Sequence, residues 1–433
     1  MIRSLTLIGA LGLALSGCGG YAEAEYHTSG HYRSPGVTNH PGGERYQNYG
    51  TNPYVSAEED NLVTFSIDVD TGSYTLMRRD VSSEQLPNPD GVRVEEFVNF
   101  FDYKDATPQS PEEPLRIHTE VAPSPFGAGK HLMRVALKGM EIDEDDRPPA
   151  NLVFLVDVSG SMQAANKMGL VRYSLTRLTE TLNPDDQVAI VTYAGSDTVL
   201  LPPTPISERH RILSAIDGLV SGGGTNGAAG IRTAYDLAEQ AQELRAASIN
   251  RVILCSDGDF NVGVRGDALL RLIERNRDRD ISLSVFGFGR GNYNDRDMEQ
   301  MADRGNGNYA FIDREVEAER VLVKNISGTL VTIAKDAKIQ VVINSAVVER
   351  YRLIGYENRD IADEDFRDDA TDAGELGVGH TVTAFIELEL KPGVSESQQT
   401  KLGEVTVRYK SPDAQETANE LVSAISPADI RSS

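Results

Sequence analysis

Side chains that carry oxygen follow two apolar runs and one run of glycines in this 433-residue chain. Asp157, Ser159 and Ser161 form an Asp-x-Ser-x-Ser turn directly after the run "LVFLV". Thr225 follows three glycines in "GGGTN", and Asp257 follows the run "RVILCS". A strand buried on both faces ends at the edge of its sheet, so its first polar residues emerge there together. Three glycines leave room for a tight turn and a close approach of the backbone.

Together these five side chains offer only oxygen, as two carboxylates and three hydroxyls. Hard oxygen ligands without His or Cys select Mg²⁺, Ca²⁺ or Mn²⁺ over zinc or copper. Five side chains leave a coordination position open when some of them act through water, and Mg²⁺ commonly keeps waters. A carboxylate from a partner protein is the natural occupant of that position, because it is hard and anionic. The sequence therefore predicts a divalent-cation site, with Mg²⁺ favoured and Ca²⁺ or Mn²⁺ as alternatives.

From about residue 148 to 333 the chain alternates apolar runs with amphipathic stretches. Continuous apolar runs separated by helical patterns are typical of a parallel sheet that is covered by helices on both faces. We expect a doubly wound, Rossmann-like α/β domain with a mostly parallel central sheet. Such domains bind ligands beyond the carboxyl ends of the strands, where the strand order reverses. The three polar loops are therefore predicted to meet at this edge.

Strand patterns also occur on both sides of the α/β segment. Residues 58–147 combine short alternating runs, such as "TFSIDVD", with two helical stretches, the first from Ser73 to about Ser82. Residues 334–433 return to strands, and in "HTVTAFIELEL" five apolar residues share one face. We predict that the two flanking segments form one split, β-rich α+β domain, in which they pair as a sandwich and the α/β domain is inserted between them.

The stretch "FSIDVDTGSY" is similar to the metal turn but departs from it at two places. Asp68 begins the pattern, but Asp70 and Gly72 stand where the metal turn has its two serines. The run before it alternates, which indicates a half-buried strand and not a central one. We interpret it as a strand end at which Thr71 or Ser73 caps the next helix. An accessory cation site at the two aspartates is the alternative, and their role stays open.

The N-terminus has the pattern of a targeting segment over residues 1–17. Arg3 precedes the apolar run "LTLIGALGLAL", which is too short to span a membrane permanently. The segment ends in "LSGC", which resembles the bacterial lipobox, so Cys18 is predicted to become the lipidated first residue of the mature protein. By resemblance to the sorting rule of enteric bacteria, Gly19 favours the outer membrane. Residues 18–57 lack an apolar period and are predicted to be a disordered tether.

Composition limits the partners and the chemistry of the chain. The net charge of -24 would repel a nucleic-acid backbone, so no nucleic-acid partner is expected. Cys255 is the one other cysteine and lies within an apolar run, which predicts a buried core residue. The sequence contains no H-E-x-x-H, G-x-S-x-G or G-x-x-x-x-G-K-[ST] motif, so we do not expect an enzyme.

The pieces "DVSGSM", "GGGTN" and "SDG" resemble, in this order, the metal-ion-dependent adhesion site of the von Willebrand factor A domain. The resemblance covers the whole α/β segment. It implies that Ser159, Ser161 and Thr225 coordinate the ion directly. It also implies that Asp157 and Asp257 act through water or switch to direct contact. An acidic residue of a partner protein would complete the coordination shell.

The wider chain resembles a family of bacterial proteins in which this domain lies between an N-terminal region and a C-terminal β region. The resemblance is carried by "VRVEEFVNFFDY", "GDFNVG", "GNGNYAFID" and "YRLIGYENR". Members usually continue further at the C-terminus, which predicts a shortened member. We expect an envelope-anchored, cation-dependent module for adhesion or scaffolding, whose partner presents Asp or Glu. The alternatives are a structural envelope protein whose ion only stabilises the fold, and a metal-assisted hydrolase.

Overall fold

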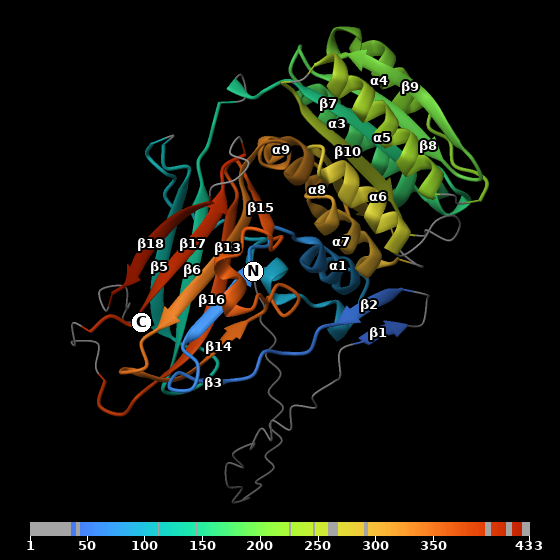
Figure 1. Ribbon diagram of the computed structural model, residues 1–433. Coiled ribbons are helices and arrows are strands. Elements are labelled where there is room, and N and C mark those ends of the chain that lie inside the picture. Colours follow the sequence, from blue (N-terminus) through green and yellow to red (C-terminus); the bar gives the residue numbers. More distant parts are fainter. Residues whose placement is uncertain are drawn as a thin grey trace, which may run out of the picture. The chain divides into compact units, whose positions relative to one another are not determined.

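An α/β domain and a β-sandwich make up the described part of the chain (Figure 1). The computed structural model describes residues 36–39, 44–110, 112–143, 146–224, 227–245, 247–258, 267–289, 293–394, 400–412 and 418–426. The predicted signal segment, Cys18 and Thr225 lie outside these residues.

Six strands form the central sheet of the α/β domain, in the order β12-β11-β10-β7-β8-β9. Their bounds are Ala150–Asp157 (β7), Gln187–Tyr193 (β8), Asp197–Pro205 (β9), Ile249–Ser256 (β10), Ile281–Phe288 (β11) and Tyr309–Ile312 (β12). All neighbours pair in parallel except β8 and β9. From β7 the chain moves outward to β8 and β9, and it returns to β10 on the other side of β7. The predicted doubly wound, mostly parallel sheet is therefore confirmed, and its strand order reverses between β7 and β10.

Helices cover both faces of this sheet (Figure 1). One face carries α3 (Leu170–Thr181), α4 (Arg209–Asp217), α8 (Glu315–Glu319) and α9 (Ile326–Leu330). The other carries α5 (Gly227–Leu244), α6 (Asp267–Arg277) and α7 (Asp295–Arg304). Along β7, Phe154 belongs to the first core and Leu155 to the second. Successive apolar residues of the central strands thus enter the two cores alternately, which explains why these strand runs are apolar without alternation.

The N-terminal segment contributes to the α/β domain as well as to the sandwich. Leu76 of α1 (Gly72–Val81) lies in the same core as α5, α6 and α7. Tyr46 of β2 (Arg45–Asn48) is 3% exposed and lies in that core too, and β2 pairs with β1 (Gly36–Asn39). The prediction of a disordered tether is therefore wrong from residue 44 to 57, because a buried tyrosine ring anchors this part.

The sandwich consists of two five-stranded sheets. In the first, β15 (Gly374–Gly377), β13 (Thr332–Ile343), β17 (Gly403–Lys410) and β18 (Ala418–Ile425) follow one another, and β4 (Leu62–Ser66) pairs with β13. In the second, the order is β3 (Val55–Ser56), β14 (Val348–Ile354), β16 (Thr381–Leu390), β6 (Lys130–Gly139) and β5 (Leu115–Pro123). The pairs β4–β13 and β6–β16 join strands from opposite sides of the α/β domain. The predicted split domain is confirmed.

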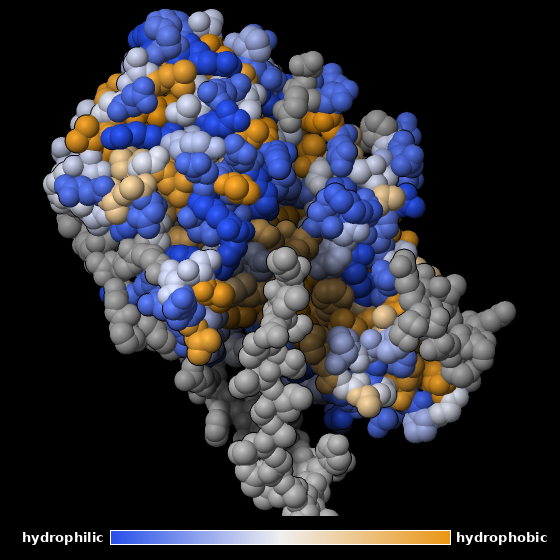
Figure 2. Space-filling view, turned by 180° about the vertical axis from the view of Figure 1, so that it is seen from behind, coloured by the Kyte–Doolittle hydropathy of each residue, from blue (hydrophilic) through white to orange (hydrophobic). Residues whose placement is uncertain are grey.

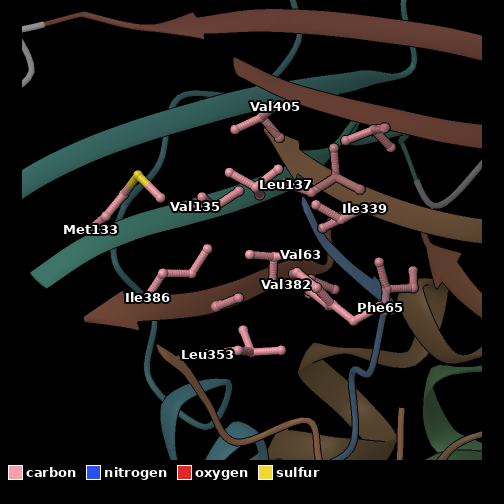
Figure 3. Packing of buried hydrophobic residues seen from close by; sticks show 14 of the residues in the cluster. Val63, Phe65, Met133, Val135, Leu137, Ile339, Leu353, Val382, Ile386 and Val405 are labelled. Carbon is pink, nitrogen blue, oxygen red and sulfur yellow. The ribbon is translucent and has the colours of Figure 1, made fainter. Parts of the chain in front are cut away.

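Apolar side chains from both sheets form the core of the sandwich (Figure 3). Phe65 of β4 and Val405 of β17 face Val135 of β6 and Val382 of β16, and all four are at most 1% exposed. Full burial of such a side chain stabilises the fold by about 1.5–3 kcal/mol. Because the core needs strands from both flanks, neither flank can complete it alone.

The surface is mostly hydrophilic on the face that Figure 2 shows, with smaller hydrophobic areas interspersed. Cys255 is fully buried in the core of the α/β domain, as predicted. Among the helices of the described residues, none is both long and apolar enough to cross a membrane.

Candidate metal centre

The predicted metal turn follows β7 at the edge where the strand order reverses. Asp157 ends the strand, and its side chain is fully buried. Its Oδ1 accepts the backbone N–H of Ser159 at 2.8 Å, which folds the turn back on itself. The hydroxyl oxygens of Ser159 and Ser161 lie 2.9 Å apart. Ser159 is buried and Ser161 is exposed, so the turn leads from a buried carboxylate to the surface.

The glycine loop lies directly against this turn. The N–H of Gly222 donates to the carbonyl of Val158 at 2.7 Å, and the N–H of Gly160 donates to the carbonyl of Gly223 at 3.1 Å. Gly223 has a φ of +91°, a backbone conformation that other residues rarely adopt. The two hydrogen bonds hold Gly222 and Gly223 beside the serines. Thr225, the third predicted hydroxyl ligand, lies outside the described residues.

Asp257 follows β10, the strand next to β7 in the sheet. The hydroxyl of Ser256 donates to Oδ2 of Asp157 at 3.0 Å, and the hydroxyl of Tyr193 reaches the same oxygen at 3.3 Å. Asp257 is 2% exposed. The structure thus brings four of the five predicted ligands, Asp157, Ser159, Ser161 and Asp257, to one edge of the sheet.

Two buried carboxylates at one edge raise the electrostatic energy of the site. Burial raises the pKa of Asp157 to about 6, and repulsion from Asp257 acts in the same direction. The hydrogen bonds from Ser159 and Ser256 oppose this rise, because they stabilise the ionised form. A divalent cation bound there would reduce the repulsion between the two carboxylates.

A lysine that the sequence reading missed also belongs to this edge. Nζ of Lys167 lies 2.8 Å from Oδ2 of Asp257, and the two side chains are 9% and 2% exposed. Lys167 lies in η4 (Ala165–Gly169), a π-helical turn between the metal turn and α3. A lysine in the polar run "QAANKMG" reads as a solvent-exposed residue, so no local pattern reveals its burial.

The donor set fits a hard divalent cation. Carboxylate and hydroxyl oxygens are the ligands that Mg²⁺, Ca²⁺ and Mn²⁺ prefer. Within the described ranges, no group of three or more His, Cys, Asp or Glu side chains is arranged to hold a metal ion. The candidate site agrees with this, because it contains only two carboxylates and depends on hydroxyls for its other ligands.

The similar stretch around Asp68 and Asp70 has a different structure. Both residues are 5% exposed. Oδ2 of Asp68 lies 3.2 Å from Nε of Arg359, and Oδ1 of Asp70 accepts the backbone N–H of Tyr309 at 2.8 Å. Nη2 of Arg359 lies 3.9 Å from Oδ2 of Asp70, so one guanidinium serves both carboxylates. This stretch is therefore a strand end, and the guanidinium of Arg359 supplies the positive charge beside its two aspartates.

The predicted cap of the helix after this stretch is wrong. Thr71 stands at the N-cap of α1 but makes no capping hydrogen bond with its side chain. The backbone N–H of Ser73 instead donates to Oε2 of Glu96 at 2.6 Å. The cap comes from a residue 23 positions later, which local sequence patterns do not show.

Comparison with known proteins identifies the class of the chain. Residues 151–327 match the family described as von Willebrand factor type A domain, and residues 40–134 match one described as von Willebrand factor. Together with the doubly wound fold, these matches define a protein with a von Willebrand factor A domain. Residues 328–431 match the C-terminal family of the uncharacterized protein YfbK. The chain is 39% identical over 399 residues to that protein from Escherichia coli strain K12, which covers 87% of this chain and 69% of the relative. The chain belongs to the YfbK family.

More distant relatives share a smaller part of the chain. Human inter-alpha-trypsin inhibitor heavy chain H4 is 31% identical over 121 residues, which are 27% of this chain and 13% of that protein. The magnesium-chelatase 67 kDa subunit of Chlorobaculum tepidum is 32% identical over 121 residues, 27% of this chain and 18% of the subunit. A solved von Willebrand factor type A structure from Catenulispora acidiphila has a TM-score of 0.45 at 16% identity and covers 75% of each chain.

Proposed function

We propose that the chain is a divalent-cation-dependent protein-binding module of the cell envelope, and that its cation accepts a carboxylate from a partner protein. The observation that carries this proposal is the meeting of two buried carboxylates and two serine hydroxyls at the reversal point of the sheet. This is the edge at which doubly wound domains bind ligands.

In the proposed site, Asp157, Ser159, Ser161, Thr225 and Asp257 hold the cation, with Mg²⁺ favoured over Ca²⁺ or Mn²⁺. The bound cation supplies a coordination position for an anionic oxygen. Because Ser161 is exposed while Asp157 is fully buried, the ligand set extends from the interior to the surface. A partner's Asp or Glu can therefore reach the cation without opening the fold.

The proposal includes attachment to the envelope through a lipid on Cys18, with the outer membrane as the favoured location. Its support is the lipobox-like "LSGC" at the end of an apolar segment. Metabolic labelling with an alkyne fatty acid tests it directly. Label is expected on the wild-type chain and not on Cys18→Ser. Equal labelling of the two chains would remove the lipid anchor from the proposal.

A capture experiment tests the binding function. The full chain is used to capture proteins from solubilised cell envelopes in Mg²⁺, in EDTA, and as the variants Asp157→Ala and Thr225→Ala. Ser196→Ala serves as a matched control, because Ser196 is an exposed serine of the neighbouring loop and not a proposed ligand. In Mg²⁺, the wild type and Ser196→Ala are expected to capture a specific partner. Neither site variant should capture it, and no chain should capture it in EDTA. Capture that persists in EDTA and in both site variants would contradict the proposal.

The same preparations separate the two alternatives. An ion that only stabilises the fold would raise the melting temperature in Mg²⁺ without any Mg²⁺-dependent capture. A metal-assisted hydrolase would turn over peptide or phosphoester substrates, and this activity would disappear in Asp157→Ala.

A further inference from the structure

Lys167 holds an ammonium group inside the candidate metal centre. Its Nζ lies 2.8 Å from Oδ2 of Asp257, and its side chain is only 9% exposed. Lysine is almost never fully buried unless it is paired. Removing a charge from water is unfavourable, and an ion pair offsets this only in good geometry. Lys167 is paired in this way with a predicted metal ligand, so its positive charge acts directly on the candidate site.

The fold makes room for this lysine at one glycine. Gly289, at the end of β11, has a φ of +85°. A Cβ on Gly289 would lie 2.4 Å from Cε and 2.4 Å from Cγ of Lys167. The stem of the lysine thus runs across the bare backbone of Gly289. Any larger residue there would displace the stem, so the ammonium is directed at Asp257 by its packing as well as by charge.

The charges of the site show what the ammonium changes. The two ionised carboxylates of Asp157 and Asp257 carry two negative charges, and Lys167 reduces the sum to one negative charge. A divalent cation then brings the site to one positive charge. Without the lysine, the same cation would leave the site neutral. The lysine therefore weakens attraction for the cation and strengthens attraction for an anionic ligand of the bound cation.

We infer that Lys167 sets the charge of the cation site, so that the site binds its cation less tightly and, once it is filled, attracts a carboxylate. This inference rests on the proposed function, because it assumes that the five ligands hold a divalent cation. It assigns Lys167 the role of setting the charge of that site.

A purely structural role for Lys167 makes the opposite prediction. If the lysine only held Asp257 in place, its removal would loosen a ligand and weaken cation binding. If it sets the charge, its removal strengthens cation binding and weakens carboxylate binding. The two effects have opposite signs on the cation, so a binding measurement distinguishes them.

The experiment uses the full chain in detergent, freed of metal by chelation, with Mn²⁺ as the cation and acetate as the carboxylate. Free Mn²⁺ is measured by electron paramagnetic resonance, and acetate bound to Mn²⁺ is measured by the relaxation of its methyl protons. The variants are Lys167→Met, which keeps the apolar stem, and Lys167→Gln, which also keeps a hydrogen-bond donor. Lys401→Met is the control, because Lys401 is exposed on the loop before β17.

Both Lys167 variants are expected to bind Mn²⁺ about tenfold more tightly and acetate about tenfold more weakly than the wild type. The reason is that each variant lacks one positive charge beside the cation site. Lys401→Met should match the wild type. If Lys167→Met does not fold, Lys167→Gln alone decides. Weaker or unchanged Mn²⁺ binding in the folded variants, with normal binding by the wild type, would overturn the inference and leave the proposed function intact. A wild type that binds no Mn²⁺ would overturn the proposed function itself.

Discussion

Arg93 and Asp295 form a buried ion pair across 202 positions of the chain. Nη2 of Arg93 lies 3.1 Å from Oδ1 of Asp295, and Nη1 contacts the other carboxylate oxygen. The residues are 5% and 0% exposed, and the hydroxyl of Tyr309 donates to Oδ1 of Asp295 at 2.6 Å. The pair joins the segment before α2 (Val94–Val98) to α7 of the α/β domain. It therefore holds the N-terminal region against the domain that carries the metal centre.

Removal of one partner of this pair should destabilise the fold strongly. Arg93→Met leaves the carboxylate of Asp295 buried without its counter-charge, which costs about 3–5 kcal/mol. The expected result is a large decrease in the midpoint of unfolding in urea. Arg177→Met is the matched control, because Arg177 pairs with Glu180 at a site where the side chains are 38% and 41% exposed. That change should cost at most about 1 kcal/mol. Equal effects of the two variants would show that the buried pair has no special role.

The close contact of α1 with the edge of the central sheet gives a second prediction. A Cβ on Gly72 would lie 2.2 Å from Cε1 of Tyr309. Gly72→Ala must therefore move the helix or the ring, and overpacking of this kind costs about 1–3 kcal/mol. A Cβ on Gly169 would meet nothing within 4 Å, and Gly169 has a φ of -60°. Gly169→Ala should thus be neutral or stabilise by up to about 1 kcal/mol. Thermal unfolding of both variants checks this, and an unchanged melting temperature for Gly72→Ala would contradict it.

Local patterns predict the position of Asp157 and Asp257 because both follow strands whose apolar runs are visible in the sequence. Parallel strands in a doubly wound sheet end at a common edge, so the meeting of these loops follows from topology. Lys167, Arg359 and Glu96 could not be placed in the same way. Lys167 and Arg359 pair with residues 90 and 291 positions away, and Glu96 accepts the N–H of Ser73, 23 positions before it. Local composition indicates solvent exposure for such charged residues.

The same limit explains the error in the predicted tether. Residues 44–57 have no apolar period, and composition alone indicates disorder. The ring of Tyr46 is buried against the core of the α/β domain, and Ala57 is buried in the core of the sandwich. Isolated anchors of this kind leave no periodic pattern to detect.

Glu95 makes the stability of the fold depend on pH. Its residue is 1% exposed, and burial raises the pKa of its carboxyl to about 7, with a smaller contribution from the charge of Asp68. Between the unfolded pKa of about 4.5 and the folded value, the native state keeps a proton that the unfolded chain has lost. Stability from this group is therefore complete below pH 4.5 and decreases as the pH rises to 7, by at most about 1.4 kcal/mol per pH unit.

Glu95→Gln tests this, because the amide imitates the neutral carboxyl at every pH. Urea unfolding at pH 5 and pH 8 should give similar stability for wild type and variant at pH 5, and a more stable variant at pH 8. Glu112→Gln, at an exposed position, should follow the wild type at both pH values. A variant that loses stability equally at both pH values would show that the carboxylate is charged in the native state.

Mg²⁺ should stabilise the chain through the metal centre, and this prediction separates the site from the rest of the fold. A ligand that binds only the native state at 100 times its Kd adds about 2.7 kcal/mol to the free energy of unfolding. The melting temperature of the wild type should therefore rise with Mg²⁺ and fall again in EDTA. Ser161→Ala should lose most of this rise while keeping its cation-free melting temperature, because Ser161 is exposed and its hydroxyl contacts Ser159 at the surface end of the turn.

Ser196→Ala, an exposed serine of the neighbouring loop, should keep the full rise. If Mg²⁺ raises the melting temperature of Ser161→Ala and Ser196→Ala equally, the hydroxyl of Ser161 is not a ligand of the cation. If Ser161→Ala alone loses the rise, the cation depends on a hydroxyl at the surface end of the turn. A cation held there lies within reach of a partner's carboxylate, which is the condition that the proposed binding function requires.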